Sequence, residues 1–216
     1  MKALFTTVIL LNCFSALVNL HVYMHSWIIE DGNYSDFCDG EERQFALELW
    51  APNRLSASDR QEKSIIADDR YMYIVNALVA FSSADILVID FGLLAYSEAS
   101  ADLEFGFKKG DFVTGGLALG VDPFFYFGRL SKIENVPALI YDWRIDSVEQ
   151  ETTPLIVVDY DNGTRGYVRD ESKASFGQVK STADFIPNPN DSCPSYVLHC
   201  TKLETAPMKQ FSRPQR

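Results

Sequence analysis

The sequence is short of the residues with which enzymes activate nucleophiles and bind metals. Its 216 residues include only three histidines and four cysteines. Zinc sites need several such ligands brought together, and the cysteine spacings match neither a zinc knuckle nor a CxxC redox pair. No Gly-x-Ser-x-Gly segment marks the nucleophile of a serine hydrolase. The sequence therefore favours binding over catalysis, and it predicts no metal and no cofactor.

Positive charge is also scarce. Nineteen Lys and Arg residues stand against thirty Asp and Glu residues, so the formal net charge is −11. An acidic surface repels nucleic-acid phosphates and anionic lipid headgroups, and neither is an expected partner. A basic protein is the better hypothesis, because complementary charge speeds encounter. The alternative is that the charge serves only solubility.

Long apolar runs are few, and two segments resemble a leader or a membrane span. Residues 1–15 carry one lysine, then an apolar run and small residues. This pattern predicts a signal peptide and a secreted or periplasmic location. A cytoplasmic protein with an apolar N-terminal element, or an anchored one, is the alternative. Residues 71–96 are interrupted by two aspartates, so we expect two buried strands, about 72–81 and 85–95, and no stable membrane span.

Three cysteines remain if residues 1–15 are removed, and an odd number leaves the disulfide pattern open. Cys38 and Cys193 form a candidate disulfide, provided that the two ends of the chain meet in the fold. Cys200 then stays a free thiol. The alternative is that none of the three is paired.

Short apolar stretches separated by turn residues dominate the rest of the sequence. Apolar and polar residues alternate over residues 20–24 and 139–145, and a further strand is expected at 196–202. Many such segments at short spacing predict an all-β fold. We expect mostly antiparallel strands arranged as a sandwich or as small barrels.

The expected organisation is a single domain with one short helix. The helix is expected at about 58–68, where a capping box begins at Ser58. Residues 16–206 are expected to form one β-rich globular domain, with a subdivision near 97–101 as the alternative. Residues 207–216 are polar and are expected to form a flexible tail.

An Asn-Gly pair at residues 162–163 gives the clearest turn signal. Both residue types tolerate positive φ, which favours a two-residue type I′ hairpin loop. This loop predicts three cross-strand pairs: Tyr160 with Arg165, Val158 with Tyr167, and Val157 with Val168.

Several groups of residues resemble parts of known chemical sites. Asp90-Phe91-Gly92 resembles the metal-binding triplet of protein kinases, but the glycine-rich loop, paired lysine and His-Arg-Asp segment are absent. His21 and His25 share one strand face, and a three-histidine site would need the strand of His199 beside them. Ordinary half-exposed histidines are the preferred interpretation. Ser195 beside His199 is not a catalytic pair, because four residues of strand separate their positions too widely.

Aromatic residues near acidic ones give the candidate binding residues. The dense patch after Pro123 supplies aromatic anchors, which often carry the affinity of protein interfaces. Acidic residues would form the rim around them. The candidate binding residues are Phe124, Phe125, Tyr126, Trp143, Asp142, Asp159 and Asp161.

The sequence is compatible with two functions. The first is a non-catalytic β-domain that binds a basic protein, in the manner of the immunity proteins that neutralise basic enzymes. This analogy rests on charge and fold class alone. The alternative is an exported hydrolase or a small-ligand-binding β-barrel, with the Phe124–Phe127 region lining a pocket.

Overall fold

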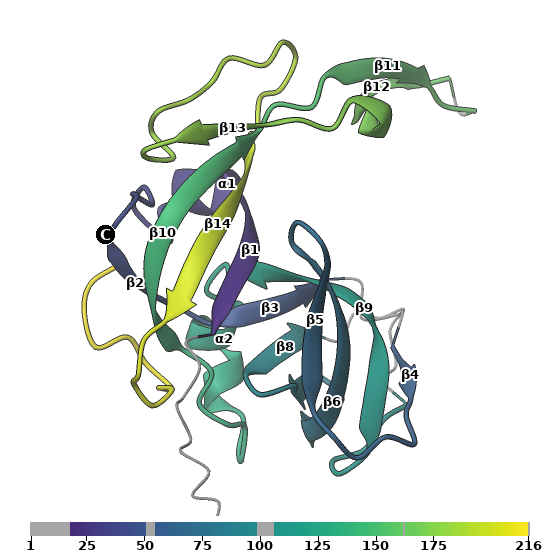
Figure 1. The fold of residues 1–216 in the computed structure, drawn as a ribbon, viewed down its shortest axis with the longest axis vertical. Helices are drawn as coiled ribbons and strands as arrows, with labels where there is room; N and C mark the ends of the chain where they lie inside the picture. The colour runs from purple at the N-terminus through teal and green to yellow at the C-terminus, as the bar shows by residue number, and fades with distance from the viewer. Residues whose placement is uncertain (1–17, 51–54, 99–105, 162, 216) are drawn as a thin grey trace, which may run out of the picture.

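The computed structural model describes residues 18–50, 55–98, 106–161 and 163–215 (Figure 1). The chain is mostly β, with 49% strand and 8% helix, and it contains a five-stranded mixed β-barrel with additional strands. The predicted all-β class is therefore confirmed. The predicted signal peptide at 1–15 lies outside the described residues, as do residues 99–101 of the predicted subdivision.

The described strands and helices are short. The strands are β1 (Asn19–His25), β2 (Glu42–Phe45), β3 (Leu47–Trp50), β4 (Ser56–Ala57), β5 (Ser64–Asp69), β6 (Met72–Ser82), β7 (Ile86–Asp90), β8 (Leu94–Glu98), β9 (Phe112–Val121), β10 (Tyr141–Glu151), β11 (Leu155–Asp159), β12 (Arg165–Arg169), β13 (Phe176–Val179) and β14 (Ser195–Lys202). The helices are α1 (Trp27–Glu30) and α2 (Phe125–Gly128), with the 3-10 turns η2 (Leu130–Lys132) and η3 (Glu171–Lys173).

Five strands close into the barrel. β6, β7 and β8 form an antiparallel meander. β8 then lies parallel to β3, where Glu48 pairs with Tyr96. β9 is antiparallel to both β3 and β6, which closes the ring. Closure removes free strand edges within the ring.

The remaining strands of the main sheet form a second layer beside the barrel. Its order is β13-β10-β14-β1, all antiparallel, and β2 also pairs with β10. β1 joins this layer to the barrel through one parallel bridge to β9, Tyr23 to Gly120. In Figure 1 the β10-β14-β1 layer stands above the barrel, and the separate β11–β12 hairpin extends away from both.

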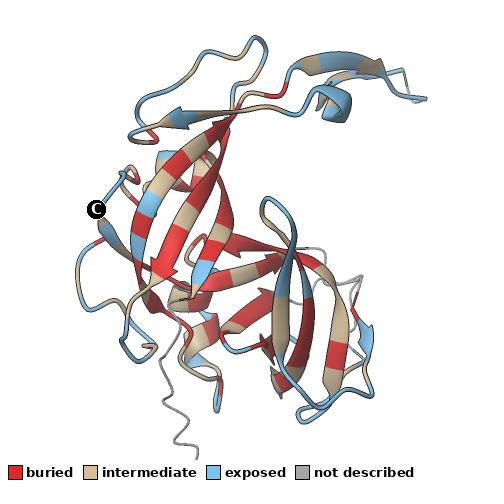
Figure 2. Cartoon of the chain, viewed as in Figure 1, coloured by how far each residue is buried: buried red, intermediate tan, exposed pale blue. Residues whose placement is uncertain are grey.

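The core is continuous through both parts, as the buried residues in Figure 2 indicate. Leu87 and Ile89 of β7 face the main cluster, whereas Ile86 and Val88 face a second cluster under α2 and η2. β7 is thus buried on both faces, as its unbroken apolar run predicts. The predicted strand at about 85–95 is divided into β7 and β8 by the turn that follows Asp90.

The predicted alternation is confirmed in β10 from Tyr141 to Ile145, whereas Leu139 and Ile140 before the strand are both buried. Tyr141, Trp143 and Ile145 are buried, while Arg144 is exposed. Trp143 stacks on Phe45, with ring centroids 5.3 Å apart. Its indole N–H donates to the Phe45 carbonyl at 3.1 Å, so the ring is buried with its polar atom bonded.

The predicted helix at about 58–68 is wrong. That region holds an irregular connection after β4 and then most of β5 instead. The Ser58 hydroxyl bonds Asn76 and accepts from the Arg60 amide, so it closes a turn and caps no helix. The segment lacks an apolar stripe at helical spacing, and local capping signals cannot stabilise a short helix without one.

The predicted hairpin forms, but its register is wrong by one residue. Asp159 pairs with Arg165, Val158 with Gly166, Val157 with Tyr167 and Ile156 with Val168. Tyr160 N–H donates to the Thr164 carbonyl at 2.8 Å, so the loop is one residue longer than a type I′ turn. Gly163 has φ of +78°, as expected for a glycine bulge after a longer turn.

Two predictions about the chain ends also differ from the structure. Cys38, Cys193 and Cys200 are free, so the Cys38–Cys193 disulfide is not formed. Cys38 lies against Ser181 and Cys193 against Ser26. The expected flexible tail is packed: Met208 bridges to Ile140, Phe211 packs on the second cluster and Gln215 is buried.

No helix in the described part of the chain is long and apolar enough to cross a membrane.

Removing the Trp143 side chain tests the importance of the shared core. We expect Trp143→Ala to lower the free energy of unfolding by about 3–5 kcal/mol, because it leaves a large cavity. Urea denaturation measures the change. Ile66→Ala, at a side chain that is 61% exposed on β5, should change it by less than about 0.5 kcal/mol. Equal losses in the two variants would contradict this description of the core.

Candidate functional site

The segment from Phe124 to Ile133, which contains α2 and η2, borders three cavities. One is ionic, one is aromatic and one is basic. The segment covers the outer face of β7 through Tyr126 and Leu130. It begins with Phe124 in the left-handed region, at φ 72°. Such a conformation in a bulky residue persists only where the surroundings enforce it.

The enforcing group is the buried carboxylate of Asp122, the residue directly after β9. Its Oδ1 accepts a hydrogen bond from the Tyr126 amide at 3.2 Å, and a second from the Tyr96 hydroxyl. Tyr34 donates to the Asp122 carbonyl at 3.0 Å. Burial raises the pKa of Asp122 to about 6, although these hydrogen bonds oppose the rise. Asp122 thus ties the start of α2 to the barrel.

A second carboxyl, Glu48 of β3, lies near this anchor. Burial raises its pKa to about 7, and repulsion from Asp122 and Glu98 adds to the rise. The Trp50 indole N–H donates to Glu48 Oε2 at 2.9 Å and lowers the pKa in part. A shifted acid near a cavity is a feature of many active sites, but structural networks shift acids too. Here the hydrogen bond from Trp50 and the place of Glu48 on barrel strand β3 account for the position of the carboxyl.

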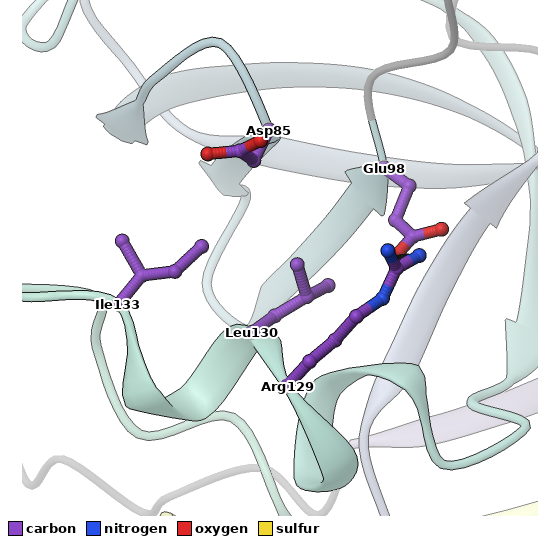
Figure 3. Close-up of a pocket in the computed structure, with 5 residues that line it drawn as sticks. All are labelled: Asp85, Glu98, Arg129, Leu130 and Ile133. Atoms are coloured by element: carbon purple, nitrogen blue, oxygen red, sulfur yellow. Dashed lines mark hydrogen bonds and ion pairs between the residues drawn. The ribbon is translucent and has the colours of Figure 1, made fainter.

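The ionic cavity has a volume of about 240 Å³ and is drawn in Figure 3. Arg129 and Glu98 form an ion pair on one side, Asp85 lies across from them, and Leu130 and Ile133 line the wall nearest η2. The arginine side chain is 64% exposed, so the pair contributes little to stability. Both charged groups of the pair are already partnered, whereas Asp85 is in no ion pair within the described structure.

The aromatic cavity has a volume of about 300 Å³. Phe124, Phe127 and Phe211 meet there, with ring centroids 4.8–5.6 Å apart. These spacings suit tilted aromatic contacts. The rings come from α2 and from the C-terminal segment, so the cavity exists only because that segment is packed.

A third feature is an exposed apolar surface on the β11–β12 hairpin, here called the hairpin patch. The patch is made by Ile156, Val157, Tyr160, Tyr167 and Val168, which are 37–52% exposed. They are five of the nine exposed large apolar residues in the described chain. In Figure 2 neither hairpin strand contains a buried residue.

Arg169 fixes the base of this hairpin. Its guanidinium pairs with Glu151 at the end of β10 and with Asp191, each at 3.1 Å. All three side chains are largely buried, at 18% exposure or less. Ion pairs shielded from water hold their geometry better than exposed ones. The Arg169 ion pairs therefore attach the hairpin to the main sheet, while the apolar residues of the hairpin patch lie outside the hydrophobic core.

The histidines do not gather into one site. His21 and His199 are cross-strand partners with rings 4.1 Å apart. His25 lies farther along β1, where its Nδ1 is 3.0 Å from the Ser195 hydroxyl. No group of three metal-ligating residues forms among the described residues. Burial lowers the pKa of His21, as it does for His25.

The His25–Ser195 pair contains the imidazole and hydroxyl of a hydrolytic dyad, but a substrate cannot reach the hydroxyl. Ser195 is fully buried, and Arg169 also donates to its hydroxyl, at 3.4 Å. A nucleophile must reach a substrate carbonyl. The pair therefore serves the packing of β1 against β14.

The residues proposed from the sequence lie in four places. Phe124, Phe125 and Tyr126 form the start of the α2 segment, with Tyr126 buried under it. Trp143 is in the core, and Asp142 bonds Gln44 at 2.8 Å and pairs with Arg213 at 3.3 Å. Asp159 and Asp161 lie at the hairpin tip. They do not form one surface.

Three residues that line the cavities were not expected from the sequence. Phe211 was assigned to a flexible tail, although a lone aromatic in a polar segment is a packing signal. Lys132 and Lys209 line the basic cavity, and no sequence pattern links two lysines so far apart in the chain. Contacts between distant segments have no local signature.

Comparison with models of known protein families, with curated proteins and with solved structures finds no match. The function is therefore argued from the geometry.

Glu48 makes stability depend on pH in a defined direction. Its pKa of about 7 in the folded state lies above its ordinary value of 4.5, so the folded protein binds more protons between these values. Stability from this group is present at low pH and is lost as pH rises. Glu48→Gln, which mimics the protonated form, should raise the unfolding free energy by about 1–3 kcal/mol at pH 8.

At about pH 5 the same substitution should stabilise by less than about 1 kcal/mol. Urea denaturation at both pH values measures the difference, and Glu134→Gln, at an exposed residue, is the control. A pH-independent effect of Glu48→Gln would contradict the raised pKa.

Proposed function

We propose that this protein is a non-catalytic protein-binding β-domain whose main contact surface is the hairpin patch. The observation that carries the proposal is the concentration of exposed apolar residues on one projecting element (Figure 1). Ile156 and Val168 pair on one face of the hairpin, and Val157 and Tyr167 pair on the other. Exposed apolar side chains gathered on one element mark interaction sites.

The hairpin also offers a physical mode of recognition. β11 and β12 pair with each other and with no other described strand. An isolated two-stranded hairpin is only marginally stable in water. Its outer edges present unpaired backbone groups, to which an extended segment of a partner can add as a strand. Val157 and Tyr167, paired across the hairpin, supply apolar contacts on one face.

Charge favours a basic partner. The net charge of −11 attracts cationic surfaces over a range set by salt. Asp159 and Asp161 lie close to the patch, and Asp159 pairs with Arg165 at 2.8 Å where both side chains are exposed. An exposed pair of this kind exchanges readily for a pair with a partner. Neutralisation of a basic enzyme, as immunity proteins perform, is the more specific form of this proposal.

A small-ligand-binding role is the second candidate function, and the aromatic cavity supports it. Its volume is at the lower end of the usual range for ligand pockets, about 300–1,000 Å³. A hydrolase is less well supported than simple binding, since the Ser–His pair described above is buried.

Site-specific photocrosslinking tests the main proposal. Benzoylphenylalanine at position 167 should trap a basic protein of the source organism, whereas the same group at position 66 should not. Both positions are exposed, but residue 66 lies on β5 of the barrel. With the trapped protein purified, Val157→Ser/Tyr167→Ser should weaken association by at least about tenfold, because interface aromatics often carry more than about 1 kcal/mol each.

Added salt should weaken the same association, and circular dichroism should stay unchanged in the variant. Three results would contradict the proposal: no specific product at position 167, an acidic partner bound independently of salt, or a second copy of this chain as the product.

A further inference from the structure

The aromatic and basic cavities adjoin each other at Phe127. The first is lined by Phe124, Phe127, Phe211 and the segment that follows Phe211. The second, of about 260 Å³, is lined by Phe127, Lys132, Lys209 and neighbouring polar residues. The two cavities, together called the hollow, thus share Phe127, with aromatic rings lining one part and lysines lining the other.

The charge of this hollow is opposite to that of the whole protein. Its described lining includes Lys132, Lys209 and Arg213 but no acidic residue, although the chain has thirty. Arg213 is engaged with Glu42 and Asp142, at 3.2 and 3.3 Å. The lysines are not engaged in any ion pair within the described structure.

The Lys132 ammonium lines the basic cavity and is bonded within its own helical turn. Its Nζ donates to the Gly128 carbonyl at 2.6 Å. An ammonium has further N–H groups, which remain available to an anion. Lys209 comes from the segment that carries Phe211, two residues away. One packed segment therefore brings a ring to the aromatic cavity and a cation to the basic one.

We propose that this hollow binds a small amphipathic anion, with an aromatic or branched apolar group against the phenylalanines and a carboxylate or sulfonate at Lys132 and Lys209. The inference rests on the second candidate function and specifies its ligand class. Apolar burial supplies most of the affinity in such sites, and a few placed polar groups fix orientation. Charge complementarity favours an anion here over a neutral ligand.

Two fluorescent probes with one ring framework separate the apolar and charge contributions. The probes are 8-anilinonaphthalene-1-sulfonate, an anion, and N-phenyl-1-naphthylamine, which lacks the sulfonate. Titration of the full chain should give one saturable site for each. Added salt should weaken binding of the anion and leave the neutral probe unchanged.

Charge reversal provides the sharper test. Lys132→Glu/Lys209→Glu should weaken binding of the anion about tenfold, because two attractive charge pairs with the sulfonate are lost. The neutral probe should change by less than about twofold. Lys109→Glu, at an exposed turn outside the hollow, is the matched control and should alter neither probe by more than about twofold.

Two further variants locate the binding. Phe127→Ala/Phe211→Ala should weaken both probes by about tenfold or more. Val157→Ser/Tyr167→Ser, in the hairpin patch, should leave both bound. If the phenylalanine variant fails to fold, the lysine variant still decides the inference, because its side chains are exposed.

The outcomes separate the two proposals. If the neutral probe binds the hollow and charge reversal leaves the anion unaffected, the anion inference is overturned while the small-ligand role stands. If neither probe binds, or the hairpin variant abolishes both, the inference and the small-ligand role fail together.

Discussion

Backbone pairing along β9 is the constraint on which the rest of the structure depends. This strand closes the barrel by pairing with β3 and β6, and it meets the second layer through Gly120 and Tyr23. Gly120 has no room for a side chain, since a Cβ there would lie 2.8 Å from the Trp50 ring. The ring in turn donates to Glu48. The packing of Trp50 over β9 within the barrel thus requires a residue without a side chain at the same position that bridges to the second layer.

The end of β9 also fixes the segment that lines the cavities. Asp122 follows the strand directly, and its buried carboxylate holds the start of α2, with Phe124 in a left-handed conformation. Burying a carboxylate is costly unless hydrogen bonds compensate. Tyr96 and the Tyr126 amide bond Oδ1 of Asp122, whereas its buried Oδ2 has no hydrogen-bond partner among the described residues. The end of β9 and the Asp122 carboxylate therefore determine the position of the aromatic cavity. The four-residue helix α2 is too short to be stable alone and does not determine it.

Sequence reasoning succeeded where local pattern and burial coincide. The alternation before Ile145 and the two-faced run of β7 report directly on which side chains face the core. It failed where the answer depends on partners. The 58–68 segment has a capping signal but pairs with β6, and the Asn-Gly loop admits two lengths that differ by one register step. The packing of Phe211 on α2, and the parallel pairing of β3 with β8, join segments far apart in the chain, which no local pattern encodes.

The two proposed surfaces differ in how the fold maintains them. The hollow beside α2 is part of the packed structure, because Phe211 and Lys209 arrive together on a segment bridged to Ile140. The hairpin patch lies outside any core, and Arg169 with its two carboxylates sets its position. Removing one partner of a buried ion pair leaves an uncompensated charge, so loss of either carboxylate would be costly although the intact pairs contribute little net stability. The arm exposes apolar residues to water, and burial of these residues against another chain would be favourable. The cavity proposed for a small molecule is thus part of the packed structure, whereas the surface proposed for protein binding lies on an arm outside the core.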